Sequence, residues 1–145
     1  MNAESALRIR CDLASLDMAR SGVIWGAIWI EAGAKAFPGG AWDDVPAAVL
    51  TAAIKATRSL RHPDMPTYFP FFDGPFDVRL DLVDAEMMSV RGRRNGQVCF
   101  QQNVLTRLWV GELRDCARAF VGRCAENGWG DSTDVVEVGD QWKAL

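Results

Sequence analysis

The segment from Phe37 to Leu60 constrains the fold most, because a glycine turn leads there into an alanine-rich helix. Pro46 suits the first helical turn, where its missing N–H is not needed, and Asp43 or Asp44 can cap the free N–H groups. Small and apolar residues then recur at helical spacing, at Val45, Val49, Ala52, Ala53, Ala56 and Leu60. Small residues on this face allow a close approach, so we expect the helix to lie on a sheet formed by the segments around it.

Two segments before this helix are predicted to be strands. Residues 7–13 alternate between apolar and charged side chains, the pattern of a strand with one face in water. Val23 to Ile30 is apolar on both faces and rich in β-branched and aromatic residues, which favours a strand buried on both sides. If one face of this strand meets the helices, the other face carries either Trp25 and Trp29 or the isoleucines. That other face must be covered by this chain, by a second copy or by a partner. A homodimer is therefore one of three arrangements that the sequence leaves open.

Four strands are expected after the helix, arranged as two hairpins. The first hairpin turns at residues 73–75, within an aromatic cluster, and its second strand alternates from Phe76 onward. Asn95-Gly96 is a strong two-residue turn signal between Met87 to Arg94 and Gln97 to Val104. The sheet is therefore predicted to be mostly antiparallel and to grow as a meander.

The last predicted helix runs from about Val110 to Asn127, where apolar residues again recur at helical spacing. Gly128 is suited to the left-handed conformation that ends a helix. In the tail, Val135 to Val138 is predicted to add a short edge strand. Together these elements predict a single α+β domain over residues 1–145. Its order is β-β-α-β-β-β-β-α, with a mostly antiparallel sheet and both helices packed on one face.

Composition narrows the classes of function. The chain has 145 residues and a net charge of −3, which gives no support for binding nucleic acid or a membrane surface. Its first residues carry charges where a signal peptide needs an apolar run, so we expect a cytoplasmic protein. The cysteines form no CxxC pair, and we expect reduced core thiols in place of disulfides or zinc ligands. They are Cys11, Cys99, Cys116 and Cys124.

The sequence contains no motif for a reaction centre. The glycine pair before the helix lacks the pattern of a phosphate-binding loop, and no nucleophile motif accompanies the lone histidine, His62. The aspartates that could gather around a metal each have a structural interpretation as a cap, a turn residue or part of a solvated face. We therefore expect no catalytic residues, no metal site and no cofactor.

Acidic side chains are concentrated between Asp64 and Glu86. This segment has six acidic residues against one basic residue, Arg79, a local charge of −5, and arginines follow it. Such blocks steer charged partners, so an acidic strand face beside the aromatic cluster suits a protein with a basic surface. A solvated sheet face without a partner is the alternative. The predicted contact residues are Asp73, Asp77, Asp81, Asp84, Phe72 and Trp42.

Two segments carry a resemblance to a group of proteins. FPGGAWDD before the first helix and FPFFDGPFDVRL after it resemble a pattern of small bacterial proteins, some of them similar to immunity proteins of polymorphic toxin systems. The resemblance spans roughly residues 22 to 129. It implies a non-enzymatic protein that binds a cognate toxin domain and blocks its active site, and it provides no catalytic residues to transfer. The alternative is a small-molecule-binding domain or small enzyme, with a pocket between the helices and the sheet.

Overall fold

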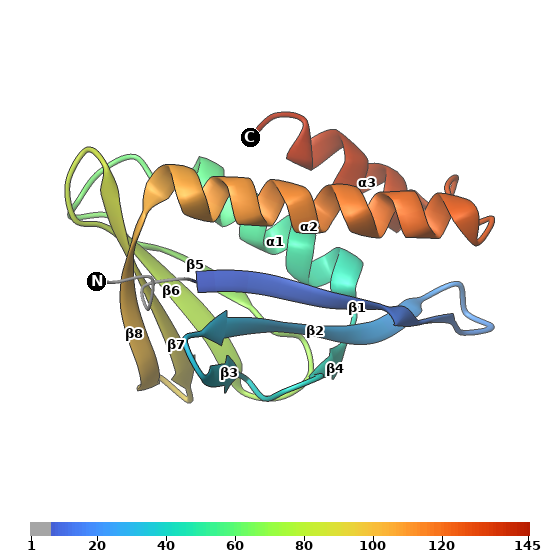
Figure 1. Cartoon of the computed structure of the whole chain (residues 1–145), viewed down its shortest axis with the longest axis horizontal. Coiled ribbons are helices and arrows are strands. Elements are labelled where there is room, and N and C mark those ends of the chain that lie inside the picture. Colours follow the sequence, from blue (N-terminus) through green and yellow to red (C-terminus); the bar gives the residue numbers. More distant parts are fainter. Residues whose placement is uncertain (1–6) are drawn as a thin grey trace.

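The computed structural model describes residues 7–145, which form two antiparallel sheets and three helices (Figure 1). The first sheet consists of β1 (Leu7–Met18), β2 (Ile24–Ala32), β3 (Lys35–Phe37) and β4 (Asp43–Asp44), and both short strands pair with β2. The second sheet consists, in order, of β5 (Thr67–Pro70), β6 (Phe76–Leu82), β7 (Met87–Arg94) and β8 (Gln97–Leu105). The helices are α1 (Pro46–Arg58), α2 (Thr106–Glu126) and α3 (Thr133–Trp142).

The helices hold the two sheets together. In Figure 1 α2 passes above β1 and begins beside β8, while α1 contacts β2 of the first sheet and β5 of the second. The third helix, α3, packs on α1 and α2. The predicted α+β class and the antiparallel pairing are confirmed, and the order of elements is roughly as predicted. The strands are divided between two sheets, however, where the sequence suggested one meander.

Buried aromatic rings join the two sheets. The ring of Phe37, in β3, lies 5.9 Å from Phe71, 5.7 Å from Phe76 and 5.3 Å from Phe100, measured between centroids. The rings of Phe37 and Phe100 can lie this close together because residue 92, in β7, is a glycine. A Cβ added there would overlap the ring of Phe100 and lie 2.8 Å from the ring of Phe37. The close contact between the sheets therefore requires glycine at position 92.

The hairpin that Asn95-Gly96 predicts is confirmed. β7 ends at Arg94 and β8 begins at Gln97, as expected, and Asn95 and Gly96 both have positive φ, 50° and 81°. These values suit a two-residue turn whose twist matches that of the flanking strands. The register between the two strands follows directly from this turn.

The predicted edge strand at Val135 to Val138 is wrong, because these residues lie in α3. Val135 and Val138 are buried, and Trp142 packs against the same core. Their spacing of three and four residues is helical, and the packing of α3 on α1 and α2 stabilises this conformation. The β-branched side chains are accommodated because tertiary packing overrides a weak local preference.

The predicted start of the second helix was late. α2 begins at Thr106 and not at Val110. Trp109, in the first turn, is fully buried and donates a hydrogen bond from Nε1 to Thr57 Oγ1 of α1, at 3.0 Å. The contact between Trp109 and α1 therefore stabilises the extra turn at the start of α2. The spacing of apolar residues within one helix does not reveal a contact with another helix.

Asp43 and Asp44 do not cap α1. The residue before the helix is Val45, and no side chain caps this end. Asp44 is instead fully buried, and its carboxylate links β4 to the loop between β5 and β6. It accepts hydrogen bonds from Val45 N (2.7 Å), Phe72 N (3.0 Å), Asp73 N (3.1 Å) and Trp42 Nε1 (3.2 Å). Four donors compensate the burial of this carboxylate, so it organises the corner where the two sheets meet.

The strand predicted between Val23 and Ile30 is confirmed, but only one face of β2 is buried in the core. Its isoleucines are buried, whereas Trp25 is 41% exposed and Trp29 is half-buried. Neither tryptophan is among the partly buried side chains that pack against the core. Trp25 is therefore the main exposed side chain on the outward face of β2, where Trp29 is partly covered and Ala27 is buried.

Candidate functional site

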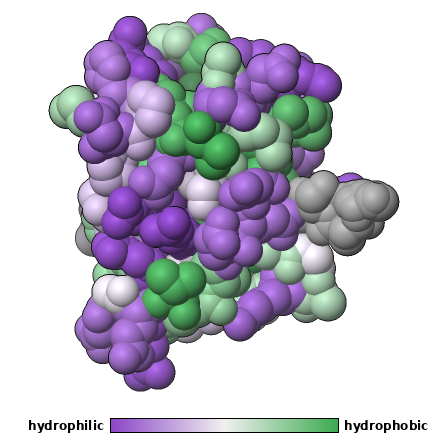
Figure 2. Space-filling model, turned by 90° about the vertical axis from the view of Figure 1, so that its left-hand side faces the viewer, coloured by the Kyte–Doolittle hydropathy of each residue, from purple (hydrophilic) through white to green (hydrophobic). Residues whose placement is uncertain are grey.

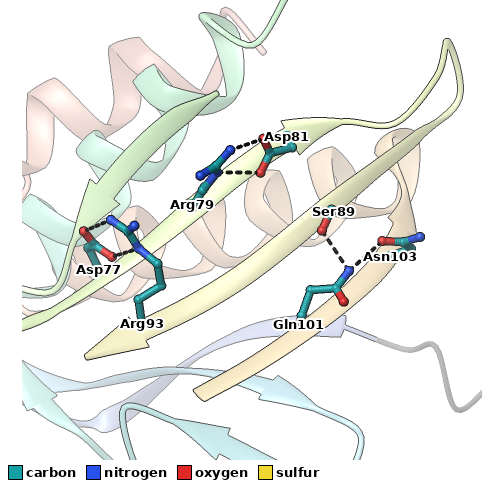
Figure 3. A network of polar contacts seen from close by, with 7 residues as sticks. All are labelled: Asp77, Arg79, Asp81, Ser89, Arg93, Gln101 and Asn103. Carbon is teal, nitrogen blue, oxygen red and sulfur yellow. Dashed lines mark hydrogen bonds and ion pairs between the residues drawn. The ribbon is translucent and has the colours of Figure 1, made fainter. Parts of the chain in front are cut away.

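The outward face of the second sheet carries an ordered layer of polar side chains, part of which is shown in Figure 3. The alternation along the strands explains the layer, because Val78, Leu80 and Val90 point into the core while their neighbours point outward. We call this surface the polar sheet face. It consists of Tyr68 from β5, Asp77, Arg79 and Asp81 from β6, Ser89, Arg91 and Arg93 from β7, and Gln101 and Asn103 from β8.

Asp77 and Arg93 form a bidentate ion pair between β6 and β7 (Figure 3). They lie opposite each other in the register, and Arg93 donates from Nη2 and Nε to the two carboxylate oxygens at 2.7 and 2.8 Å. The hydrogen bond to Asp77 raises the pKa of Arg93. Two parallel hydrogen bonds fix the plane of the guanidinium group as well as its position.

Arg79 and Asp81 form the second bidentate pair, within β6 (Figure 3). Residues two apart on a strand share a face, and Arg79 donates from Nε and Nη2 to Asp81 at 2.9 and 3.0 Å. The hydrogen bond to Asp81 raises the pKa of Arg79. Two of the predicted contact carboxylates, Asp77 and Asp81, are thus already paired within the chain.

The ring of Tyr68 lies against both paired arginines. The guanidinium carbon of Arg93 is 4.9 Å from the ring centroid, and that of Arg79 is 5.9 Å away. Both distances are within the range of a cation–π contact. Tyr68 is nevertheless 46% exposed, so the ring and the two guanidinium groups form an ordered cluster at the surface.

Arg91 is the arginine of the polar sheet face that makes no hydrogen bond or ion pair with another residue in 7–145. It lies opposite Arg79 on one side and Gln101 on the other. The face carries three guanidinium groups against two carboxylates, a net charge of +1. The separation of acidic and basic residues along the sequence is therefore not retained on this surface.

The β8 side of the polar sheet face is uncharged. Gln101 Nε2 donates to Ser89 Oγ and to Asn103 Oδ1, both at 3.0 Å (Figure 3). Figure 2 shows this side of the molecule, with hydrophilic residues across its middle and hydrophobic patches above and below them. Val83, after β6, and Val98, in β8, are among the exposed apolar residues of this sheet. The surface thus combines an ordered polar centre with apolar groups at its ends.

Phe72 and Asp73 lie in the loop between β5 and β6, at one end of the second sheet. Phe72 is 54% exposed, and Asp73 is also exposed. Their backbone N–H groups both donate to Asp44, which holds the loop in place. The structure thus presents both predicted contact residues on a fixed loop beside the polar sheet face.

Asp84 and Trp42 have structural contacts of their own. Asp84 lies in the turn between β6 and β7, where it accepts hydrogen bonds from the N–H groups of Glu86 and Met87, both at 2.8 Å. These bonds lower the pKa of Asp84. Trp42 is half-buried, and its ring meets that of Phe76 edge-on at 5.2 Å. Neither residue belongs to the polar sheet face.

A surface groove of about 330 Å³ lies between α1, α3 and the loop that carries Phe72. It is formed mainly by alanines of α1, with Asp134 and Glu137 of α3 also lining it. The pocket of the small-molecule alternative was expected between the helices and the sheet, where a second groove of about 220 Å³ lies between β1 and α2. Within residues 7–145 no cluster of three or more histidine, cysteine or acidic side chains is arranged to hold a metal ion.

The cysteines of residues 7–145 are free thiols, and Cys116 and Cys124 are buried. Burial raises the pKa of Cys116 to about 12 and that of Cys124 to about 11, and it also raises the pKa of Cys11. These thiols therefore stay protonated at neutral pH, and a protonated thiol is a poor nucleophile.

Comparison with models of known protein families, with curated proteins and with solved structures finds no match to this chain. None of the helices in residues 7–145 has both the length and the hydrophobicity needed to cross a membrane.

Proposed function

We propose that the chain is a non-enzymatic protein-binding module that contacts its partner through the polar sheet face. We further propose that it acts as an immunity protein, which binds a cognate toxin domain and blocks its active site. The observation that carries the proposal is the ordered surface cluster of Tyr68, Arg79 and Arg93.

The order of this cluster favours tight binding. A long side chain that becomes fixed on binding costs about 0.5–1.5 kcal/mol, and this cost is reduced when the free protein already holds it in place. Arg79 and Arg93 are held by bidentate ion pairs, and Tyr68 packs against both. Tyrosine and arginine are also among the residues that most often dominate the binding energy of interfaces.

The charges of the surface indicate what the partner presents to it. Arg91 has unused donors at the centre of the polar sheet face, so we propose that a carboxylate or backbone carbonyl of the partner faces it. Asp73 is exposed on the neighbouring loop, and its carboxylate is paired with no other residue in 7–145. A basic group of the toxin, as the sequence suggested, is therefore proposed opposite Asp73, beside an acidic group opposite Arg91.

The toxin class of the partner is proposed from the resemblance of two segments. In the structure these segments, residues 37–44 and 69–80, meet at Asp44, which accepts hydrogen bonds from Phe72 and Asp73. Phe37 also contacts Phe76 across the same corner. The resemblance of these two segments therefore supports a scaffold, shared with the immunity-like proteins, that holds the loop carrying Phe72. The contact residues themselves are proposed from the geometry of the polar sheet face.

Co-expression in bacteria tests the proposal. The product of the neighbouring gene should arrest growth when it is expressed alone, and this chain should restore growth. The variants Tyr68→Ala and Arg91→Glu should lose the rescue and weaken binding of the purified proteins at least tenfold. Matched controls are Val136→Ala, on α3 and also 46% exposed, and Arg118→Glu, on α2 and in an exposed ion pair.

The outcomes separate the two parts of the proposal. Rescue that is lost with the polar sheet face variants and retained with both controls supports an inhibitor acting through this face. Binding without an effect on growth would contradict the immunity role and leave the binding surface supported. Equal binding by Tyr68→Ala, Arg91→Glu and the wild type would contradict the proposed surface.

A further inference from the structure

The outward face of the first sheet has features that the polar sheet face lacks. We call it the tryptophan face; it comprises Arg8, Arg10, Asp12 and Asp17 of β1, and Trp25, Ala27, Trp29 and Glu31 of β2. Trp25 is 41% exposed, and Ala27, between the tryptophans, is buried and small. Exposed tryptophans on a sheet are typical of interaction surfaces, because covering them removes a large apolar area from water.

The charges of the tryptophan face are separated along β1. Arg8 and Arg10 lie at one end, opposite Glu31 and Trp29, whereas Asp12 and Asp17 lie at the other end. Glu31 lies 3.7 Å from Arg10 and reduces the net charge of this end to +1, against −2 at the other end. Both side chains of the contact are well exposed, so it contributes little to stability. One face thus has a basic half and an acidic half.

This separation is complementary to itself under one kind of two-fold symmetry. We consider a two-fold axis that lies in the plane of the interface, runs perpendicular to the strands and passes over Ile28. On β2, Trp25, Ala27, Trp29 and Glu31 are spaced evenly about Ile28, and Asp17 pairs with Trp25 although β1 bulges between Asp12 and Asp17. The axis therefore places Arg10 opposite Asp12 of the second copy and Arg8 opposite Asp17. A two-fold axis parallel to the strands and passing over β1 would instead place Arg8, Arg10, Asp12 and Asp17 opposite their own copies, which brings like charges together. Self-complementarity is what a symmetric dimer requires of its surface.

The same axis also matches the shapes of the side chains. It places the large ring of Trp29 opposite the small, buried Ala27 of the second copy. Large side chains facing small ones allow two sheets to pack closely. The charges thus favour this arrangement, and the Trp29–Ala27 register is compatible with it.

We propose that two copies of the chain associate through their tryptophan faces, with the β1 strands antiparallel across the interface. Nine residues of β2 extend about 30 Å, and the two strands β1 and β2 are about 10 Å wide, so each copy contributes about 300 Å². This is below the usual size of a stable interface, and we therefore expect weak self-association that depends on protein concentration. The polar sheet face belongs to the other sheet and is not used.

A charge-swap experiment tests this dimer by sedimentation equilibrium between 1 and 300 μM. Arg8→Glu and Asp17→Arg should each weaken self-association at least tenfold, because each places like charges opposite each other in both symmetric contacts. An equimolar mixture of the two variants should associate as well as the wild type, since the heterodimer restores opposite charges in both. Arg8 and Asp17 are exposed and unpaired within residues 7–145, so both variants should fold.

Two controls complete the test. Arg118→Glu and Asp115→Arg, an exposed pair on α2, should leave self-association unchanged. Trp29→Ala, checked for native folding by circular dichroism, should weaken it at least tenfold. A wild-type chain that remains monomeric at 300 μM would overturn the proposal. A dimer that the Arg8 and Asp17 variants leave intact, or that their mixture does not restore, would also overturn it. Each outcome is independent of toxin binding.

Discussion

The outward faces of the two sheets use similar residues in opposite arrangements. Both combine arginines, aspartates and aromatic rings, but the polar sheet face pairs its charges across and along its strands, whereas the tryptophan face separates them. On the first surface Asp77 lies opposite Arg93. On the second, Asp12 lies opposite Ala27 and Asp17 lies opposite Trp25, whereas Arg8 lies opposite Glu31. The register therefore pairs Asp77 of the polar sheet face with an arginine and leaves Asp12 and Asp17 of the tryptophan face opposite uncharged residues.

Paired and unpaired charges affect the binding of another protein in different ways. Charges that are paired within the chain fix side chains in place, which prepares a surface of defined shape for a different protein. Charges that remain unpaired contribute little to the free energy of unfolding, but they select an orientation when two surfaces meet. These differences agree with the roles proposed above, partner binding for the polar sheet face and self-association for the tryptophan face.

The largest expected effect tests the scaffold on which both faces depend. Asp44→Ala should lower the free energy of unfolding by about 3 kcal/mol or more, because it leaves four N–H donors without their acceptor at a buried site. Urea denaturation provides the measurement. Asp43→Ala, at the exposed neighbour, should change the value by less than about 0.5 kcal/mol. A loss below about 1 kcal/mol for Asp44→Ala would contradict the structural role of its carboxylate.

Replacing Gly92 tests the close contact between the two sheets. Gly92→Ala should destabilise the fold by about 2 kcal/mol, because the new methyl group would overlap Phe100 and approach Phe37. The matched control is Gly111→Ala in α2, where an added Cβ has no neighbour within 4 Å. That change should stabilise the fold by up to about 1 kcal/mol, since alanine favours helix over glycine. Unfolding temperatures that change in the same direction for both variants would contradict the claim that Gly92 is needed for the close contact between the sheets.

Double-mutant cycles compare the two faces directly. The coupling energy between Asp77 and Arg93 should be about 1 kcal/mol, because their bidentate contact is partly shielded from water. The coupling between Arg10 and Glu31, at 3.7 Å and more exposed, should be about 0.3 kcal/mol or less in the monomer. Alanine substitutions and urea denaturation at low protein concentration give both values. Equal coupling energies in the two pairs would contradict the claim that the polar sheet face holds its charged side chains more firmly than the tryptophan face.

The smallest effect concerns Asp84, a predicted contact residue outside both faces. Its folded-state pKa is lowered, first by the hydrogen bond from Glu86 and then by that from Met87. Its stabilising contribution is therefore present above the unfolded pKa of about 3.9 and is lost as pH falls through the folded pKa. The stability difference between the wild type and Asp84→Asn should be largest near neutral pH and decrease toward pH 2. A difference that is constant over this range would contradict the effect.

Local patterns in the sequence predicted much of the fold. The alternation in β1 and β6, the Asn95-Gly96 turn and the spacing of α2 each depend on nearby residues, and the structure bears them out. α3 was missed, although the i, i+3, i+7 spacing of Val135, Val138 and Trp142 was a readable helical signal.

Features that depend on distant contacts could not be predicted in the same way. The role of Asp44 rests on N–H groups of Phe72 and Asp73, 28 and 29 residues away. The division into two sheets depends on how the ring of Phe37 packs against the second sheet. The Asp77–Arg93 pair could have been found, because a hairpin register for β6 and β7 would have placed the two residues opposite each other.

Nuclear magnetic resonance of the arginine side chains tests the central claim most directly. The Nε–Hε signals of Arg79, Arg91 and Arg93 report on the polar sheet face, and that of Arg118 serves as an internal control on α2. When the purified product of the neighbouring gene is added to the labelled chain, we predict that the first three signals shift and saturate together while that of Arg118 stays in place. Binding that leaves the signals of Arg79, Arg91 and Arg93 unchanged would contradict the account.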